Sequence, residues 1–146
     1  LIPLNKFFTS YRKTRLKKGQ FIYSVKIPIY KKNIFKAYKI SKRFDDDISS
    51  VCGSFNIELD KTRIKKIKIA YGGMSEIPKR AKNTEKILNN SNFSEKIFNK
   101  AIKKLEKDYK PIDDMRASKS YRMEIAKNLL MKCFLEVKSK KILRIN

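Results

Sequence analysis

The residues of this chain that most directly suggest site chemistry are two cysteines, Cys52 and Cys133, which lie far apart in a sequence with no histidine. A structural zinc site takes about four Cys or His ligands at short spacing, so this sequence cannot build one alone. The absence of histidine also excludes a His-based catalytic triad within the chain. Both cysteines stand among apolar residues, which predicts small buried side chains. We therefore predict no catalytic residue and no metal ligand in the chain.

A glycine pair and an acidic run are the next candidates. Gly72 and Gly73 lack the spacing of a phosphate-binding loop, and we interpret them as a turn that needs positive φ. Three consecutive aspartates, residues 45–47, repel one another and must be solvated or paired. Lys42 and Arg43 are the nearest cations, so we predict an ion pair between this run and one of them.

Four larger polar side chains invite either a functional or a structural interpretation. Arg116 and Arg122 lie around the expected start of the last helix. We predict that they form structural salt bridges within the domain and do not contact substrate. Tyr71 and Tyr121 are predicted to be core residues with satisfied hydroxyls.

The charge of the chain is strongly positive, with 37 basic against 14 acidic residues among 146, a net charge of +23. Lysines outnumber arginines and are scattered over every segment, whereas a nucleic-acid surface is typically clustered and rich in arginine. We therefore expect non-specific adhesion at low salt and no specific nucleic-acid partner. No apolar run approaches the roughly 18 residues of a membrane span, so we expect no membrane association and a cytoplasmic protein.

The elements that must position these residues follow from hydrophobic periodicity. Apolar-rich runs predict strands at 21–27, which Pro28 ends, and at 35–41, and alternation of apolar with polar residues predicts strands at 51–59 and 67–71. Helical stripes follow and predict three helices, at 79–88, 94–109 and from about 118 to 137. We therefore predict an α+β fold, with an antiparallel sheet of about three to four strands followed by a three-helix layer.

Five blocks of sequence occur in a fixed order: FFTSYRKT at 7–14, GQFIYSVKIP at 19–28, AYKISKRFDDDI at 37–48, AYGGM at 70–74 with PKRA at 78–81, and DDMRASKSYR at 113–122. Together they resemble the C-terminal part of the FAD domain of xanthine dehydrogenase small subunits, in the molybdenum hydroxylase flavoprotein family. The DMRAS block favours the xanthine dehydrogenase branch over carbon monoxide dehydrogenase.

This resemblance implies a piece of a larger oxidoreductase. Residues 1–30 would be the end of the main FAD-binding domain, 31–138 a CO dehydrogenase flavoprotein C-terminal-like domain, and 139–146 a basic tail. In the family, electrons from xanthine or hypoxanthine oxidation at a molybdenum cofactor pass through two [2Fe–2S] clusters to FAD and then to NAD+. The implied partners are the N-terminal FAD and 2Fe–2S portions of the same subunit, the molybdenum-binding large subunit, and NAD+.

Two residues carry over from the family as FAD contacts. Lys39 matches a lysine that contacts the cofactor, and Ile22 matches an apolar position that packs near it. Residues 40–47 match a mobile loop near the flavin that influences access of NAD+. The family's phosphate-binding segments lie before Leu1, so we expect the isolated chain to fold, to bind FAD weakly and to be inactive.

Two alternatives from other classes stay open on the sequence alone. A basic nucleic-acid-binding module would account for the charge, although the scattered lysines and the ordered blocks argue against it. A non-catalytic fragment that serves only as an assembly surface would account for the same blocks without chemistry.

Overall fold

The computed structural model describes residues 1–43 and 47–143. Its centre is an antiparallel five-stranded sheet of order β3-β4-β5-β6, in which β7 pairs with the far end of β5. Three long strands carry the sheet: β3 (Ile34–Ile40), β4 (Val51–Asp60) and β5 (Arg63–Gly72). Two short strands complete it, β6 (Lys79–Arg80) and β7 (Ser91–Asn92). The α+β prediction and the antiparallel sheet are confirmed.

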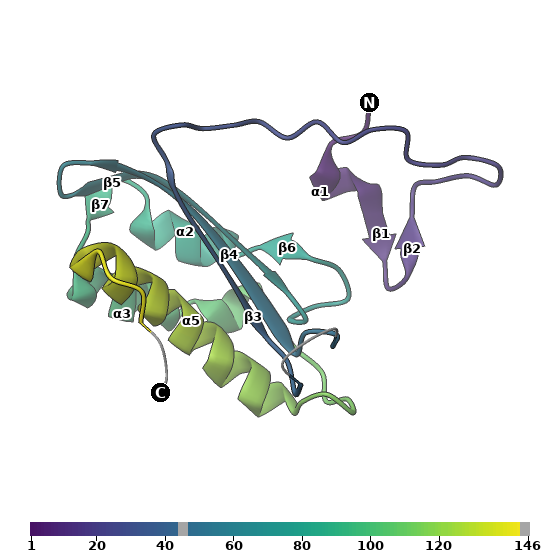
Figure 1. The fold of residues 1–146 in the computed structure, drawn as a ribbon. Coiled ribbons are helices and arrows are strands. Elements are labelled where there is room, and N and C mark those ends of the chain that lie inside the picture. The colour runs from purple at the N-terminus through teal and green to yellow at the C-terminus, as the bar shows by residue number, and fades with distance from the viewer. Residues whose placement is uncertain (44–46, 144–146) are drawn as a thin grey trace.

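The helices cover one face of this sheet (Figure 1). They are α2 (Lys82–Leu88), α3 (Glu95–Ile102), α4 (Leu105–Asp108) and the long α5 (Lys119–Ser139). Alternation in β4 and β5 explains the layering, because Phe55, Ile57 and Ile69 are fully buried toward the helices while their polar neighbours are not. A cluster of Phe93, Phe98 and Phe134 fills the space between α3 and α5.

The last helix begins where the sequence predicts. Ser118 is its N-cap, and its side-chain oxygen accepts a hydrogen bond from the backbone N–H of Tyr121. The cap of α2 comes from a distant residue instead. The buried carboxylate of Asp108 accepts from the backbone N–H groups of Asn83 and Thr84 and from the Thr84 hydroxyl. These bonds satisfy backbone N–H groups at the N-terminus of α2, whose own N-cap residue makes no side-chain hydrogen bond.

Two predicted helices differ in extent. Lys79 and Arg80 pair with β5, so α2 begins only at Lys82. The predicted helix over 94–109 is divided into α3 and α4. The division falls at Lys104, whose N–H bonds to the Ala101 carbonyl three residues earlier. Such bonds form the tighter 3-10 turn and interrupt the α-helix.

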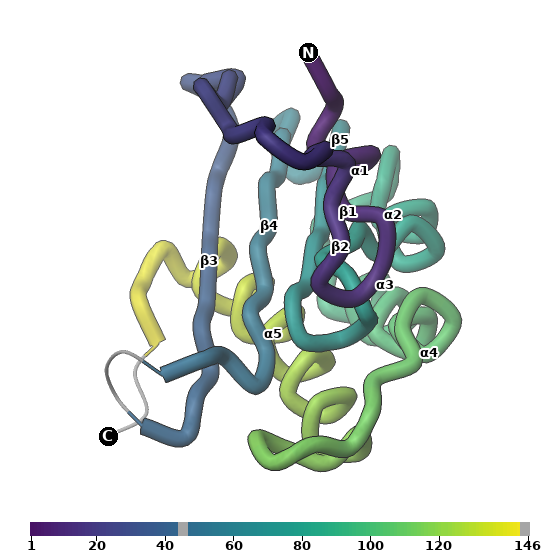
Figure 2. The backbone as a smooth tube through the Cα atoms, turned by 90° about the vertical axis from the view of Figure 1, so that its right-hand side faces the viewer, coloured from purple at the N-terminus to yellow at the C-terminus, as the bar shows by residue number. Residues whose placement is uncertain are grey.

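The first thirty residues lie apart from the sheet and helices (Figures 1 and 2). They contain α1 (Leu4–Phe7) and a small hairpin of β1 (Phe8–Ser10) and β2 (Lys13–Thr14), on the side of the sheet opposite the helices. The predicted strand over 21–27 is wrong, because residues 20–30 form no regular structure. An extended segment becomes a strand only when another strand pairs with it, and here none does.

Candidate functional site

One face of the sheet lies opposite the helices. Where β3 ends, this face carries mostly small side chains. We call this part of the surface the open face, and it comprises Ala37, Lys39, Cys52, Ser54, Ala70 and Gly72. These residues adjoin one another in the ladder, since Lys39 is opposite Cys52 and Ala37 opposite Ser54 on β4, and Ser54 is opposite Ala70 on β5. A flat surface of small residues allows close approach of a planar group.

Lys39 is the one long side chain among the residues of the open face. It stands one residue before the end of β3 and is exposed, and its ammonium makes no hydrogen bond or ion pair with the described residues. The other predicted contact, Ile22, lies in the irregular segment 20–30 and is about half exposed. That segment runs toward the start of β3, at the opposite end of the strand from Lys39 (Figure 1). The described structure therefore does not bring the two predicted FAD contacts together.

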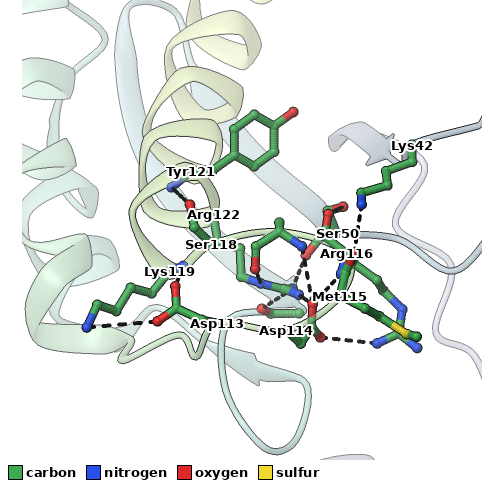
Figure 3. Close-up of polar contacts among 12 residues, drawn as sticks. Lys42, Ser50, Asp113, Asp114, Met115, Arg116, Ser118, Lys119, Tyr121 and Arg122 are labelled. Atoms are coloured by element: carbon green, nitrogen blue, oxygen red, sulfur yellow. Dashed lines mark hydrogen bonds and ion pairs between the residues drawn. The ribbon is translucent and has the colours of Figure 1, made fainter.

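A hollow of about 470 Å³ lies beside the end of β3. It is lined by residues that follow β3 and by the turn before α5, namely Ser41, Lys42, Ser50, Asp114, Met115, Arg116, Ala117, Ser118 and Tyr121. Figure 3 shows how these side chains converge on the start of α5. Their polar groups bond mainly to one another, so the hollow is a junction of three chain segments.

Asp114 organises the turn before α5. One of its oxygens accepts from the backbone N–H groups of Arg116 and Ala117, and the carboxylate also pairs with the guanidinium groups of Arg116 and Arg122. The backbone N–H of Arg116, followed by that of Ala117 and by the Arg122 guanidinium, lowers the pKa of Asp114 to about 2. The carboxylate is therefore ionised throughout the physiological range.

Arg122 joins the segments beneath this turn. Its side chain is only 4% exposed, and it donates to the carbonyls of Ser50 and Gly73 as well as to Asp114. Gly73 has φ of +78°, and a Cβ at this position would overlap the Ser50 carbonyl oxygen. The predicted turn with positive φ is confirmed at Gly73, whereas Gly72 is the last residue of β5. The predicted salt bridges of Arg116 and Arg122 within the domain are confirmed.

Of the four tyrosine and cysteine residues that were predicted to be buried, two are buried and two are not. Tyr71 is buried, and its hydroxyl donates to the Ala126 carbonyl at 2.7 Å. Tyr121 was predicted to be a core residue, but it is 46% exposed and lines the hollow beside the end of β3. Burial raises the pKa of the Cys133 thiol to about 12, as expected of an inert cysteine. The prediction that Cys52 is buried is wrong, because Cys52 belongs to the open face and is half-buried.

The acidic run is described only in part. Asp47 pairs with Arg43 at 3.6 Å, which confirms one of the two predicted partners, while Lys42 donates instead to the Met115 carbonyl at 2.7 Å. Asp45 and Asp46 lie outside the described residues. Among the described residues, no cluster of three His, Cys, Asp or Glu side chains could hold a metal ion. In that same part of the chain, no helix is long and apolar enough to cross a membrane.

Sequence reasoning missed the buried acids Glu85, Asp108 and Glu136. Glu136, on α5, accepts from the Tyr38 hydroxyl at 2.9 Å and pairs with Lys36 at 3.1 Å, both on β3. Burial acts to raise the pKa of Glu136, but the bonds from Lys36 and Tyr38 outweigh it and hold the pKa below its ordinary value. The signal was its place three residues after Cys133, on the buried stripe of α5.

Comparison with known proteins places this architecture in a family. Residues 36–137 match the CO dehydrogenase flavoprotein C-terminal domain. A glyceraldehyde dehydrogenase medium chain from Sulfolobus acidocaldarius is 31% identical over 134 residues, which cover 90% of this chain and 46% of that protein. A xanthine dehydrogenase from Dictyostelium discoideum is 31% identical over an alignment 159 positions long, which covers 99% of this chain and 12% of that protein.

A solved structure has the same fold. Quinoline 2-oxidoreductase from Pseudomonas putida 86 superposes with a TM-score of 0.81 at 19% identity, over 95% of this chain and 48% of that chain. The present chain thus spans less than half of the length of each relative named. The family match covers most of the packed region, from the middle of β3 almost to the end of α5. The chain therefore belongs to the CO dehydrogenase flavoprotein C-terminal domain family.

Proposed function

We propose that this chain forms one wall of the flavin site of a xanthine dehydrogenase, which passes electrons from purine oxidation through FAD to NAD+. In this proposal residues 1–30 end the main FAD-binding domain, 31–138 form the C-terminal domain and 139–146 a basic tail. The observation that carries the proposal is Lys39, an exposed cation at the edge of an open face made of small residues. The family match over 36–137 supports a flavoprotein role for the same surface.

The open face fits a planar, electron-accepting ring. Ala37, Ser54 and Ala70 present little side-chain bulk, so a ring can lie close to the strands. When bound, FAD supplies the redox chemistry, while the protein binds, orients and tunes it. The ammonium of Lys39 stabilises negative charge that develops on the reduced ring. Ile22 would contact a part of FAD away from Lys39, because segment 20–30 runs toward the opposite end of β3.

The glycine turn at Gly73 offers no cradle for the phosphates of FAD, because the Gly73 carbonyl accepts from Arg122 and the space beside its Cα is filled by Ser50. In this proposal, the phosphates bind to the N-terminal FAD portion of the same subunit. The exposed apolar segment 21–29 supports such a partner, since Phe21, Tyr23 and Ile29 are each at least 78% exposed. The 2Fe–2S portion and the molybdenum-binding subunit would complete the path of the electrons to FAD.

The test uses the natural polypeptide that contains this segment, purified with its partners. We expect flavin and iron–sulfur absorption bands that bleach on addition of xanthine and recover with NAD+. Flavin bands that bleach only with another substrate would keep the flavin role and replace the purine. A colourless protein would overturn the flavin role itself.

A matched pair of variants tests the site. Lys39→Ala should lower the midpoint potential of the bound flavin, because it removes a cation beside the reduced ring. Lys66→Ala is the control: Lys66 is an exposed lysine of β5 opposite Glu58, toward the other end of the sheet. Equal shifts of the midpoint potential in the two variants would mean that general surface charge causes the effect and that Lys39 is not part of the site.

An assembly surface without chemistry is the second candidate, and the exposed apolar segment 21–29 favours it. It predicts that the full complex assembles through this segment, and that Lys39→Ala leaves the flavin potential unchanged.

A further inference from the structure

The end of β3 that carries Lys39 is tied to the turn before α5 by hydrogen bonds. The backbone N–H of Ser50 donates to the Ile40 carbonyl at 2.8 Å, so Ser50 is bonded to the residue next to Lys39. The Ser50 hydroxyl donates to the Arg116 carbonyl at 3.3 Å. On the other side of the connection, the Lys42 ammonium donates to the Met115 carbonyl. Both flanks of the β3–β4 connection are therefore fastened to the same turn.

Arg122 is the buried centre of this junction. Its guanidinium donates to the carbonyls of Ser50 and Gly73, and so it ties the start of β4 to the end of β5. Asp114 accepts from the same guanidinium and compensates its charge. Figure 3 shows Arg122, Asp114 and Ser50 in this junction. Through Ser50, which bonds to the Ile40 carbonyl, the junction connects to the end of β3 that carries Lys39.

Neither partner has a simple substitute. A guanidinium is planar and presents five donors in a fixed fork, so it bonds two carbonyls and a carboxylate at once. A lysine at position 122 would bring one ammonium and could not span the same three acceptors with the same geometry. The ionised Asp114 matters because an unpaired buried cation is strongly unfavourable.

We propose that the Asp114–Arg122 pair is a positioning device for Lys39, acting through Ser50 and Ile40, and that it thereby sets the electrostatic influence of Lys39 on the bound ring. This inference rests on the proposed function of the open face. Arg122 does not touch the ring in this arrangement; it fixes where the strand end, and with it the ammonium, stands.

The structural part is tested first, on the chain itself. Arg122→Lys and Asp114→Asn should each accelerate hydrogen exchange at the Ser50 amide by about tenfold or more, because loosening the junction makes opening of the Ser50–Ile40 bond more favourable. Asp108→Asn is the matched control, since it weakens the α2 cap without touching this junction. Unchanged exchange at Ser50 in both junction variants, or equal acceleration in the control, overturns the anchor.

The functional part is tested in the full flavoprotein by a double-mutant cycle. Arg122→Lys should shift the flavin midpoint potential in the same direction as Lys39→Ala, and it should have no further effect when Lys39 is already alanine. Asp108→Asn, at a comparable loss of melting temperature, should leave the potential unchanged. Additive shifts of Arg122→Lys and Lys39→Ala would overturn the route through Lys39.

The two proposals fail in different ways. If Lys39→Ala leaves the potential unchanged while the junction variants accelerate exchange at Ser50, the proposed function of the open face is wrong and the anchor is only structural. If Lys39→Ala shifts the potential and Arg122→Lys and Asp114→Asn do not, Lys39 belongs to the site and the positioning role of Arg122 is wrong. Asp114→Asn serves as the second variant should Arg122→Lys fail to fold.

Discussion

Residues 31–143 and residues 1–30 are both rich in large apolar side chains, but only residues 31–143 bury them. Within the residues that the structure describes, every buried hydrophobic side chain belongs to the stretch from Val51 to Phe134. No residue of the first thirty is buried, and Phe21 and Tyr23 are 78% and 91% exposed. Large exposed apolar sets mark interaction surfaces, so residues 1–30, which we call the first region, are a candidate contact surface for another part of the protein.

Two segments that predict strands gave different results in the two regions. Residues 51–59 alternate and form β4, which has β3 on one side and β5 on the other. Residues 21–27 are rich in apolar and β-branched or aromatic residues, yet form no strand. The difference is the partner, because a strand is stabilised by cross-strand pairs and ladder hydrogen bonds that one segment cannot make alone.

The largest expected effect contrasts two phenylalanines across this boundary. Phe134→Ala removes a fully buried ring that packs on Phe93 and Phe98, and should cost about 3–5 kcal/mol of unfolding free energy. Phe21→Ala should change it by less than about 0.5 kcal/mol, as for other exposed positions. Urea unfolding followed by circular dichroism measures both. A cost for Phe21→Ala near that of Phe134→Ala would mean that the first region is packed in solution.

Two glycines with positive φ give a second contrast. Gly73→Ala places a Cβ against the Ser50 carbonyl at φ of +78°, and should cost about 2 kcal/mol or more. Gly19→Ala meets no atom within 4 Å at a similar φ of +80° and lies in the first region. It should leave the unfolding of the packed region unchanged, because the strain falls on a segment outside the cooperative unit. The same urea unfolding experiment measures both, and equal losses of unfolding free energy would contradict the separation of the two regions.

Within the packed region, most of the fold was predictable from periodicity. The hairpin of β4 and β5 follows from alternation on both sides of a turn at Lys61, where φ is positive. The start of α5 follows from Ser118 as an N-cap. The end of α3 did not follow, because hydrogen bonds to the third residue back shorten it, and helix patterns do not register such local tightening.

The candidate site was predictable only through the family resemblance. Lys39 is one of many lysines, and nothing in its neighbours along the chain distinguishes it. The junction behind it was not foreseen, since Ser50, Gly73 and Arg122 are far apart in sequence and meet only after the sheet and α5 have packed. Asp108 as the cap of α2 was missed for the same reason.

Acid pH should weaken the packed region through Asp114. Its folded pKa of about 2 lies below the ordinary value of 3.8, so its contribution to stability is complete above that value. The contribution is lost as pH falls through 3.8 toward 2. Asp114→Asn should cost about 1–2 kcal/mol at neutral pH, and the difference from the wild type should shrink below pH 4. A difference that stays constant down to pH 2 would contradict an ionised Asp114 in the junction.

The smallest expected effect is the sharpest test of the comparison. Deleting residues 1–29 removes the exposed region and retains Tyr30, whose ring lies 5.3 Å from the Lys68 ammonium. We expect the unfolding midpoint in urea to stay within the error of the measurement, because no residue of the deleted region is buried. Solubility should rise, since the exposed apolar segment is gone. A clear loss of stability would show that the first region packs on the sheet in the isolated chain, and the open face would then not be free to receive a ring.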